Sequence, residues 1–264
     1  MLDRVESIVR EVAAAVVVPK FQALTAGEIE EKAPGELVTV ADRESERVLA
    51  ERLTELLPGS LVVGEESVAV DPAIMDLLRG PEPIWVIDPI DGTANFAAGR
   101  EPFALMVALV QAGQPRLAVI FEPISGLMSI AESGSGAYIN GERATMATVP
   151  VPTSDLRGSV LSRFLPPELR ARVSEGAATL GELLPGHHCA AREYPDVVRG
   201  VQQFAMFWRV LPWDHVPGTL LVREAGGVVR RFSGEDYNMT QSGQGLLIAR
   251  DENVFKQVHK ALLA

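Results

Sequence analysis

The segment "PIWVIDPIDGTANF", Pro83–Phe96, constrains this chain more than any other. It begins as an apolar run typical of a buried strand and then places two aspartates three residues apart, Asp88 and Asp91. An ionised carboxylate at the end of a buried strand is costly to remove from water unless a positive charge meets it. The stretch Trp85–Phe96 contains no lysine or arginine, so a local ion pair is not available. A metal cation is the obvious alternative.

The residues around the two aspartates suit a hard divalent ion. Mg²⁺ takes oxygen ligands, typically one or two carboxylates together with waters and substrate phosphate oxygens. Pro89 biases Asp88 towards an extended conformation, so a sharp turn after the strand would let both carboxylates and the Ile90 carbonyl face one point. The amides from Gly92 to Ala94 would then begin a helix whose N-terminus can hold a phosphate. One loop is therefore predicted to supply cation ligands and an anion site.

Other acidic residues lie at comparable places. Glu65 and Glu66 follow the apolar run "SLVVG". Asp214, in "PWDHVPGTLLVREAGG", is expected to be the N-cap of a helix with Pro217 in its first turn. Each has a structural alternative: a solvated loop for the glutamates, a helix cap for Asp214 and a capped turn for the aspartate pair.

Composition narrows the class of protein. The 264 residues are 47% hydrophobic, enough to bury a substantial core in one large domain or two fused halves. A net charge of −11 argues against binding to a nucleic-acid polymer. The single cysteine, Cys189, fits a reducing compartment. Charges interrupt the N-terminal apolar stretch, so it is not a secretory signal, and no segment approaches the ~20 apolar residues of a membrane span. We expect a cytoplasmic protein without a membrane partner.

Hydrophobic periodicity predicts strands and helices in both halves of the chain. An amphipathic N-terminal helix is expected to end near Pro19, a second helix to span 41–57 and a last one to follow Asp251 as its N-cap. Strands are expected at 60–64, 84–88, 103–110, 116–123, 127–133, 203–210, 227–232 and 245–249, and "GSGAYINGE" reads as a turn region. The composition shifts at "VPVPTS", which divides one compact α/β unit into halves 1–150 and 151–264.

Taken together, "GEES", "DPIDGTANF" and "WDHVPGTLLVREAGG" resemble the inositol monophosphatase family of Mg²⁺-dependent, lithium-sensitive phosphatases. The nine residues Asp88 to Phe96 match its central motif almost letter for letter, and "ELVTVADRESE" and "GAYING" are further matches. The landmarks follow the family's order over nearly the whole chain. The resemblance implies a layered αβαβα sandwich of the inositol monophosphatase and fructose-1,6-bisphosphatase type. It also implies a homodimer that acts on a small phosphorylated metabolite.

The resemblance assigns metal ligands. Glu65, Asp88 and the Ile90 carbonyl would hold one Mg²⁺. Asp88, Asp91 and Asp214 would hold a second, and a third, weaker ion would lie near Glu65. Two cations ~4 Å apart can activate a water and stabilise the leaving oxygen of an in-line displacement.

The resemblance also assigns catalytic and substrate-binding residues. Thr93, hydrogen-bonded to Asp42, would orient and activate the attacking water together with Glu65. The substrate-binding residues would be Asp91, Gly92, Thr93, Ala94 and Asp214.

The chain departs from the family at the pocket wall. Enzymes that hydrolyse inositol phosphates generally place a glutamate seven residues before the last aspartate, where this chain has Phe207. An aromatic side chain cannot accept hydrogen bonds from the hydroxyls of an inositol ring. Inositol phosphate is therefore only the default assumption for the substrate. In "PGHHCAAREY", His187, His188 and Cys189 lack a partner cluster for zinc and are expected near the pocket wall. Arg192 and Arg209 could contact a second anionic group of a substrate, but a role at the solvated surface is the one expected for each.

The sequence thus predicts a phosphoric monoester hydrolase that requires Mg²⁺ and acts on a small sugar, polyol or nucleotide phosphate. Within that class, 3′-phosphonucleotide, histidinol-phosphate and fructose-1,6-bisphosphate phosphatases share the metal core. A protein of another class, a non-catalytic regulator that keeps the fold, is the remaining alternative.

Overall fold

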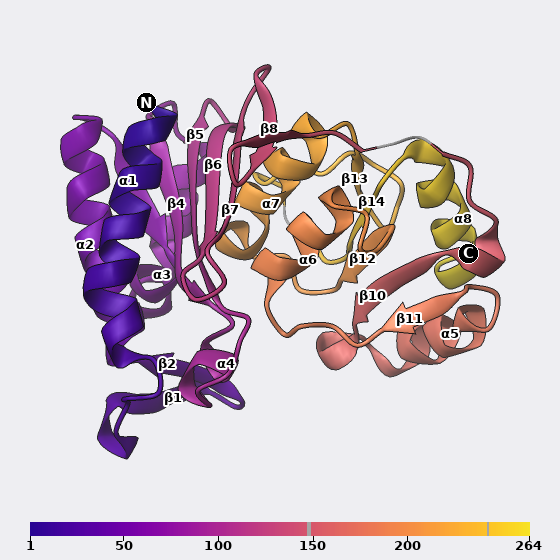
Figure 1. The fold of residues 1–264 in the computed structure, drawn as a ribbon, viewed down its shortest axis with the longest axis horizontal. Helices are drawn as coiled ribbons and strands as arrows, with labels where there is room; N and C mark the ends of the chain where they lie inside the picture. Colours follow the sequence, from indigo (N-terminus) through magenta and orange to yellow (C-terminus); the bar gives the residue numbers. More distant parts are fainter. Residues whose placement is uncertain (147–148, 242) are drawn as a thin grey trace.

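The computed structural model describes residues 1–146, 149–241 and 243–264 (Figure 1). The helices and strands of the first half are α1 (Leu2–Val12), η1 (Ala13–Val17), η2 (Val18–Lys20), η3 (Ala26–Glu28), β1 (Ile29–Ala33), β2 (Glu36–Thr39), α2 (Val40–Leu56), β3 (Leu61–Gly64), α3 (Glu65–Val70), η4 (Pro72–Arg79), β4 (Ile84–Asp91), α4 (Thr93–Ala97), β5 (Ala104–Gln111), β6 (Gln114–Glu122), β7 (Leu127–Glu132), β8 (Gly136–Ile139) and β9 (Glu142–Ala144). Those of the second half are η5 (Thr153–Asp155), β10 (Arg157–Leu161), η6 (Ser162–Phe164), α5 (Pro167–Ala177), β11 (Glu182–Leu184), α6 (Ala190–Val198), β12 (Phe204–Phe207), α7 (Pro212–Glu224), β13 (Val228–Arg231), β14 (Leu246–Ala249) and α8 (Glu252–Leu262).

Helices and sheets alternate in five layers (Figure 1). One sheet runs in the order β3-β4-β5-β6-β7-β8-β9 and the other in the order β11-β10-β12-β14-β13. Helices α1 and α2 cover the outer face of the first sheet, α6 and α7 lie between the sheets, and α5 and α8 cover the outer face of the second. The predicted αβαβα sandwich is confirmed. The division at residue 150 falls between the two sheets and stays a prediction.

Strand β4 shows how the sequence builds these layers. Its side chains alternate between faces because the side-chain period of a strand is two. Trp85 and Ile87 pack against α1 and α2, whereas Ile84 and Val86 face the inner layer of α6 and α7. A continuous apolar run is therefore the pattern expected for a strand covered on both faces.

Strand β12 repeats this arrangement in the second sheet. Phe204 and Met206 face α5 and α8, and Trp208 packs beside them, as the predicted alternating core strand requires. Phe207 faces the inner layer instead. The residue that departs from the family pattern therefore points towards the space between the sheets.

Two predicted boundaries are wrong. The chain does not turn sharply after Asp88, because β4 continues to Asp91 through an irregularity in its pairing with β5. Pro89 has no N–H to donate to the ladder, and it is tolerated there because it lies in the irregular stretch between the paired residues Asp88 and Asp91. The supposed turn region "GSGAYINGE" contains β8 and β9, joined at Asn140 and Gly141, which both have positive φ as a tight hairpin turn requires.

Helix α7 also begins earlier than predicted. Its N-cap is Leu211, and Pro212 occupies the first helical turn, where a missing N–H costs little. Asp214 is consequently a first-turn residue and not the N-cap, and Pro217 lies inside the helix. The predicted N-cap Asp251 is confirmed, since its side chain accepts a hydrogen bond from the Val254 amide.

Within the described ranges, no helix combines the length and apolarity that crossing a membrane requires. The expected homodimer and cytoplasmic location stay predictions.

Gly218 is predicted to be essential for the contact between α6 and α7. A Cβ at this position would lie 2.2 Å from ring atoms of Tyr194, which is fully buried. We expect Gly218→Ala to lower the free energy of unfolding by about 1–3 kcal/mol in urea denaturation, because the buried ring must shift. Gly27→Ala is the matched control, since nothing lies within 4 Å of its Cβ position. Equal effects of the two substitutions would contradict this packing argument.

Candidate metal and phosphate site

Three acidic side chains from separate elements converge at one edge of the first sheet. Strands β3 and β4 are parallel neighbours with Gly64 opposite Ile87, so the next residues, Glu65 at the start of α3 and Asp88 still within β4, are neighbours. Asp214 reaches the same place from the first turn of α7. One carboxylate oxygen from each of Glu65, Asp88 and Asp214 lies within 4.8 Å of the others. We call these three residues the carboxylate cluster.

The carboxylate cluster is short of positive charge. Asp88 is 1% exposed, and its Oδ1 is buried without a hydrogen-bond partner in the part of the chain that the structure describes. Burial, followed by repulsion from Glu65, Asp91 and Asp214, raises the pKa of Asp88 well above its ordinary value. Burial and the nearby charges of Asp91 and Glu65 raise the pKa of Asp214 in the same way. A divalent cation would satisfy the orphaned oxygen and remove the repulsion, so these residues fit a hard-metal site.

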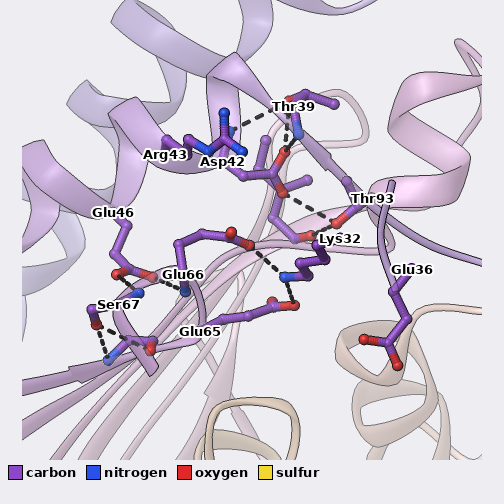
Figure 2. Close-up of polar contacts among 12 residues, drawn as sticks. Lys32, Glu36, Thr39, Asp42, Arg43, Glu46, Glu65, Glu66, Ser67 and Thr93 are labelled. Carbon is purple, nitrogen blue, oxygen red and sulfur yellow. Dashed lines mark hydrogen bonds and ion pairs between the residues drawn. The ribbon is translucent and has the colours of Figure 1, made fainter. Parts of the chain in front are cut away.

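Lys32 lines the same cavity as the carboxylate cluster and was not identified from the sequence. Its ammonium on β1 donates to Glu65 Oε1 and Glu66 Oε1, each at 2.7 Å (Figure 2). Burial opposes the charge, but the two carboxylates outweigh it and raise the pKa of Lys32. No local signal could have identified this contact, because it joins β1 to residues more than 30 positions away.

The predicted contact between Thr93 and Asp42 is present. Thr93 Oγ1 lies 3.1 Å from Asp42 Oδ1 and 2.9 Å from the Ile90 carbonyl oxygen (Figure 2). The other oxygen of Asp42 accepts the Thr39 amide at 2.8 Å and the Thr39 hydroxyl at 2.6 Å. The Asp42 side chain is thus held in place while burial raises its pKa to about 7. The catalytic role of this pair stays a prediction.

Asp91 lies outside the carboxylate cluster. Its Oδ2 accepts the Ala191 amide of α6 at 2.6 Å, which ties the loop after β4 to the inner helical layer. Gly92 follows with φ of 85°, and a Cβ there would lie 3.2 Å from Cys189 Cβ. Glycine is therefore required both by the left-handed backbone and by the close approach of Cys189.

The two neighbouring histidines have different surroundings: His187 is held by other residues, whereas His188 lines the cavity. His187 Nε2 lies 3.0 Å from Asp196 Oδ2, and the His187 amide donates to Glu193 Oε1 at 2.7 Å. Asn95 of α4 donates to the His187 carbonyl at 3.0 Å, so this segment is braced against the aspartate loop. His188, with φ of 56°, lines the cavity.

The two arginines expected at the surface are both engaged with carboxylates. Arg192 Nε donates to Glu122 Oε1 at 2.6 Å, and Glu122 is almost fully buried. Arg209 pairs with Glu36 and lines the cavity. The solvated role was wrong because both partners are distant in the chain and left no local pattern.

His215, the residue after Asp214, is buried and uses both ring nitrogens. Nε2 donates to the Arg209 carbonyl at 2.9 Å, which leaves Nδ1 to accept the Tyr194 hydroxyl at 2.7 Å. Burial lowers the pKa of His215 to about 4, so the ring is neutral near pH 7. His215 thus has a structural role in the cavity wall next to Asp214.

The carboxylate cluster lies in a cavity of about 690 Å³. Asp91, Gly92, Thr93 and Ala94 line it together with the three acids. The expected metal-binding and phosphate-binding residues therefore share one cavity with the side chains of the second half.

Comparison with known proteins then decides the family. The model of the inositol monophosphatase family matches residues 2–263. The chain belongs to the inositol monophosphatase family. A Thermotoga maritima protein named fructose-1,6-bisphosphatase/inositol-1-monophosphatase is 32% identical over 212 residues, 77% of this chain and 74% of that protein. The Nus factor SuhB of Escherichia coli is 28% identical over 250 residues, 91% of this chain and 88% of that protein.

A solved structure supports the same family. A Thermotoga maritima IMPase superposes with a TM-score of 0.84 at 26% identity, over 99% of this chain and 96% of that one. The family is one of metal-dependent phosphatases that act on small phosphorylated substrates.

The raised pKa values predict how pH acts on protein stripped of divalent ions. Burial raises the pKa of Asp91 to about 6 and that of Asp42 to about 7, compared with ~4 in an unfolded chain. The native state then binds more protons than the unfolded state, so stability present below pH ~4 is lost as the pH rises through about 6 to 7. We expect the melting temperature in EDTA to fall between about pH 5 and about pH 8.

Mg²⁺ should raise the melting temperature more at the higher pH, because metal binding requires ionised carboxylates. Asp88→Asn is the matched variant and should lose most of the Mg²⁺ effect. Calorimetric scans with equal Mg²⁺ effects at both pH values would contradict this electrostatic account.

Proposed function

We propose that this protein is a Mg²⁺-dependent phosphomonoesterase that hydrolyses a small sugar, polyol or nucleotide phosphate. The observation that carries the proposal is the orphaned, buried Asp88 Oδ1 within the carboxylate cluster. A protein that used these acids only for stability would satisfy that oxygen with an amide or a cationic side chain.

The metal ligands in this proposal are those that the family resemblance implies. Glu65, Asp88 and the Ile90 carbonyl would hold one ion, and Asp88, Asp91 and Asp214 another. When bound, divalent ions supply the positive charge that acidifies water and neutralises phosphate oxygens. Lys32 can stay bound to Glu65 Oε1 at 2.7 Å while Glu65 acts as a ligand, because a carboxylate has a second oxygen and further lone pairs.

The remaining residues position the reactants. When the Thr93 hydroxyl donates a hydrogen bond to Asp42, the lone pairs of Thr93 Oγ1 can accept a hydrogen bond from the attacking water. One proton of the water would stay on its oxygen, and Glu65 would take the other as the water attacks phosphorus in line with the leaving oxygen. The bond between phosphorus and the leaving oxygen would then break, and the released alkoxide would take up a proton from water. The backbone of Gly92 to Ala94 would hold the phosphate oxygens next to this water. Most of the rate enhancement then comes from position and charge.

A second candidate function is favoured by one comparison. The Nus factor SuhB among the relatives keeps open the regulatory alternative, in which the fold acts through a partner surface. The complete set of Glu65, Asp88, Asp91, Thr93 and Asp214 supports the enzyme instead, because a protein without turnover has no need of them. The two candidates differ in phosphate release.

The phosphatase proposal predicts Mg²⁺-dependent phosphate release from glycerol 2-phosphate and no release in EDTA. Asp88→Asn should lower kcat/KM by at least about 100-fold, beyond the ~10–100-fold typical of outer partners of a metal site. Thr93→Val, which keeps the shape but removes the hydroxyl, should lower kcat by about 100-fold. Asp76→Asn is the matched control because Asp76 is an exposed acid on η4.

A panel of inositol 1-phosphate, a 3′-phosphonucleotide, histidinol phosphate and fructose 1,6-bisphosphate would then name the substrate class. Folded, Mg²⁺-bound protein that releases no phosphate from any ester would overturn the enzyme and leave the regulatory candidate.

A further inference from the structure

The cavity continues from the carboxylate cluster along a wall that is mostly apolar. Its volume of about 690 Å³ is in the range of pockets for small organic molecules, far more than a phosphate group fills. Beyond the carboxylate cluster, part of the lining comes from β10, η6, β11 and the end of β12. Six of its apolar members are Leu161, Phe164, Leu183, Leu184, Phe207 and Trp208. We call these six side chains the apolar wall.

Phe207 is fixed at the part of the apolar wall nearest to Asp214. Its ring stacks on Tyr194 with centroids 5.4 Å apart and planes 11° apart. It also meets the edge of His215 at 4.8 Å. Phe207 is 2% exposed, so it has no room to swing aside and let a polar group face a ligand.

The charged side chains near the apolar wall are already paired, which leaves Ser162 and His188 as neighbouring polar side chains of the lining. Among the described lining residues, Glu36 is the one carboxylate outside the carboxylate cluster and Asp91, and it is bound to Arg209. The guanidinium of Arg209 also lies 4.6 Å from the centroid of Phe164. Both nitrogens of His215 are used by protein partners. A ring hydroxyl placed against the six apolar side chains would lose water without gaining an acceptor from them.

We propose that this wall selects phosphate monoesters whose alcohol is an apolar ring or chain over esters of polyols. The inference rests on the proposed phosphatase activity and specifies its substrate class. An apolar alcohol gains by leaving water for this surface, because the buried area is hydrocarbon on both sides. A polyol pays for desolvation of each hydroxyl instead, and a buried polar group without a partner is strongly disfavoured.

The test compares cyclohexyl phosphate with inositol 1-phosphate, using the full-length protein with Mg²⁺. Both esters have a six-carbon ring and an alkoxide leaving group, so they differ in the ring hydroxyls alone. We expect kcat/KM for cyclohexyl phosphate to be at least about tenfold higher, with most of the difference in KM. Glycerol 2-phosphate, too short to cover the wall, reports the phosphatase activity separately.

Two pairs of variants assign the preference to the wall. Phe207→Leu keeps an apolar surface and should keep the ratio of the two kcat/KM values, whereas Phe207→Gln should shift it towards inositol 1-phosphate by about fivefold or more. Phe164→Ser, at a half-exposed rim position, should shift the ratio in the same direction, and Phe164→Leu should not. A ratio is insensitive to partial unfolding, so it separates selection from loss of folded protein.

The outcomes distinguish the two proposals. If glycerol 2-phosphate is hydrolysed but inositol 1-phosphate is the better ring ester, the apolar-wall proposal is wrong and the phosphatase stands. If ratios for Phe207→Gln and Phe164→Ser equal that of the unmodified protein, the preference does not come from the wall and the proposal is also wrong. If no ester is hydrolysed, both proposals fail.

Discussion

The carboxylates of Glu65, Asp88 and Asp214 approach within 4.8 Å of one another, and Asp88 is almost completely buried. Such an arrangement repels itself in a medium of low dielectric constant, and raised pKa values for Asp88 and Asp214 are the direct consequence. In the structure described here, Lys32 neutralises part of this charge from one side, through Glu65. The rest can be relieved by protons or by a divalent cation. The proposed chemistry follows if a divalent cation relieves the repulsion.

The layered fold is what forces the three acids together. Glu65 and Asp88 are adjacent because β3 and β4 are parallel neighbours, and Asp214 arrives on a helix packed between the two sheets. The close approach of α6 and α7 at Gly218 brings Tyr194 under Phe207 and next to His215. The packing that positions the metal ligands thus also builds the pocket wall, so a change in one should alter the other.

Local patterns predicted an α/β protein and most of its strands, the family resemblance implied the αβαβα sandwich, and the turn expected after Asp88 was wrong because β4 continues to Asp91. The apolar run of β4 and the alternating residues of β12 specify strands covered on two faces, and the motif Asp88–Phe96 is contiguous. The residue at which a helix begins was predicted less accurately. Helix α7 begins at Pro212, two residues before Asp214, because proline suits the first helical turn.

The contacts that sequence could not reveal are pairs of single residues brought together by tertiary structure. Lys32 meets Glu65 across 33 positions, Arg192 meets Glu122 across 70, and the Ala191 amide meets Asp91 across 100. None carries a periodic signal, because each depends on one side chain in one geometry. The aromatic packing of Phe207 is similar: its departure from the family motif was visible, but the partners Tyr194 and His215 were not.

Anomalous diffraction from crystals soaked in Mn²⁺ tests the central claim most directly, since Mn²⁺ accepts the same oxygen ligands as Mg²⁺. We expect a peak among Glu65, Asp88 and Asp214, about 2 Å from an Asp88 carboxylate oxygen. A map without a peak there, in which Asp88 is hydrogen-bonded to protein alone, would contradict the claim.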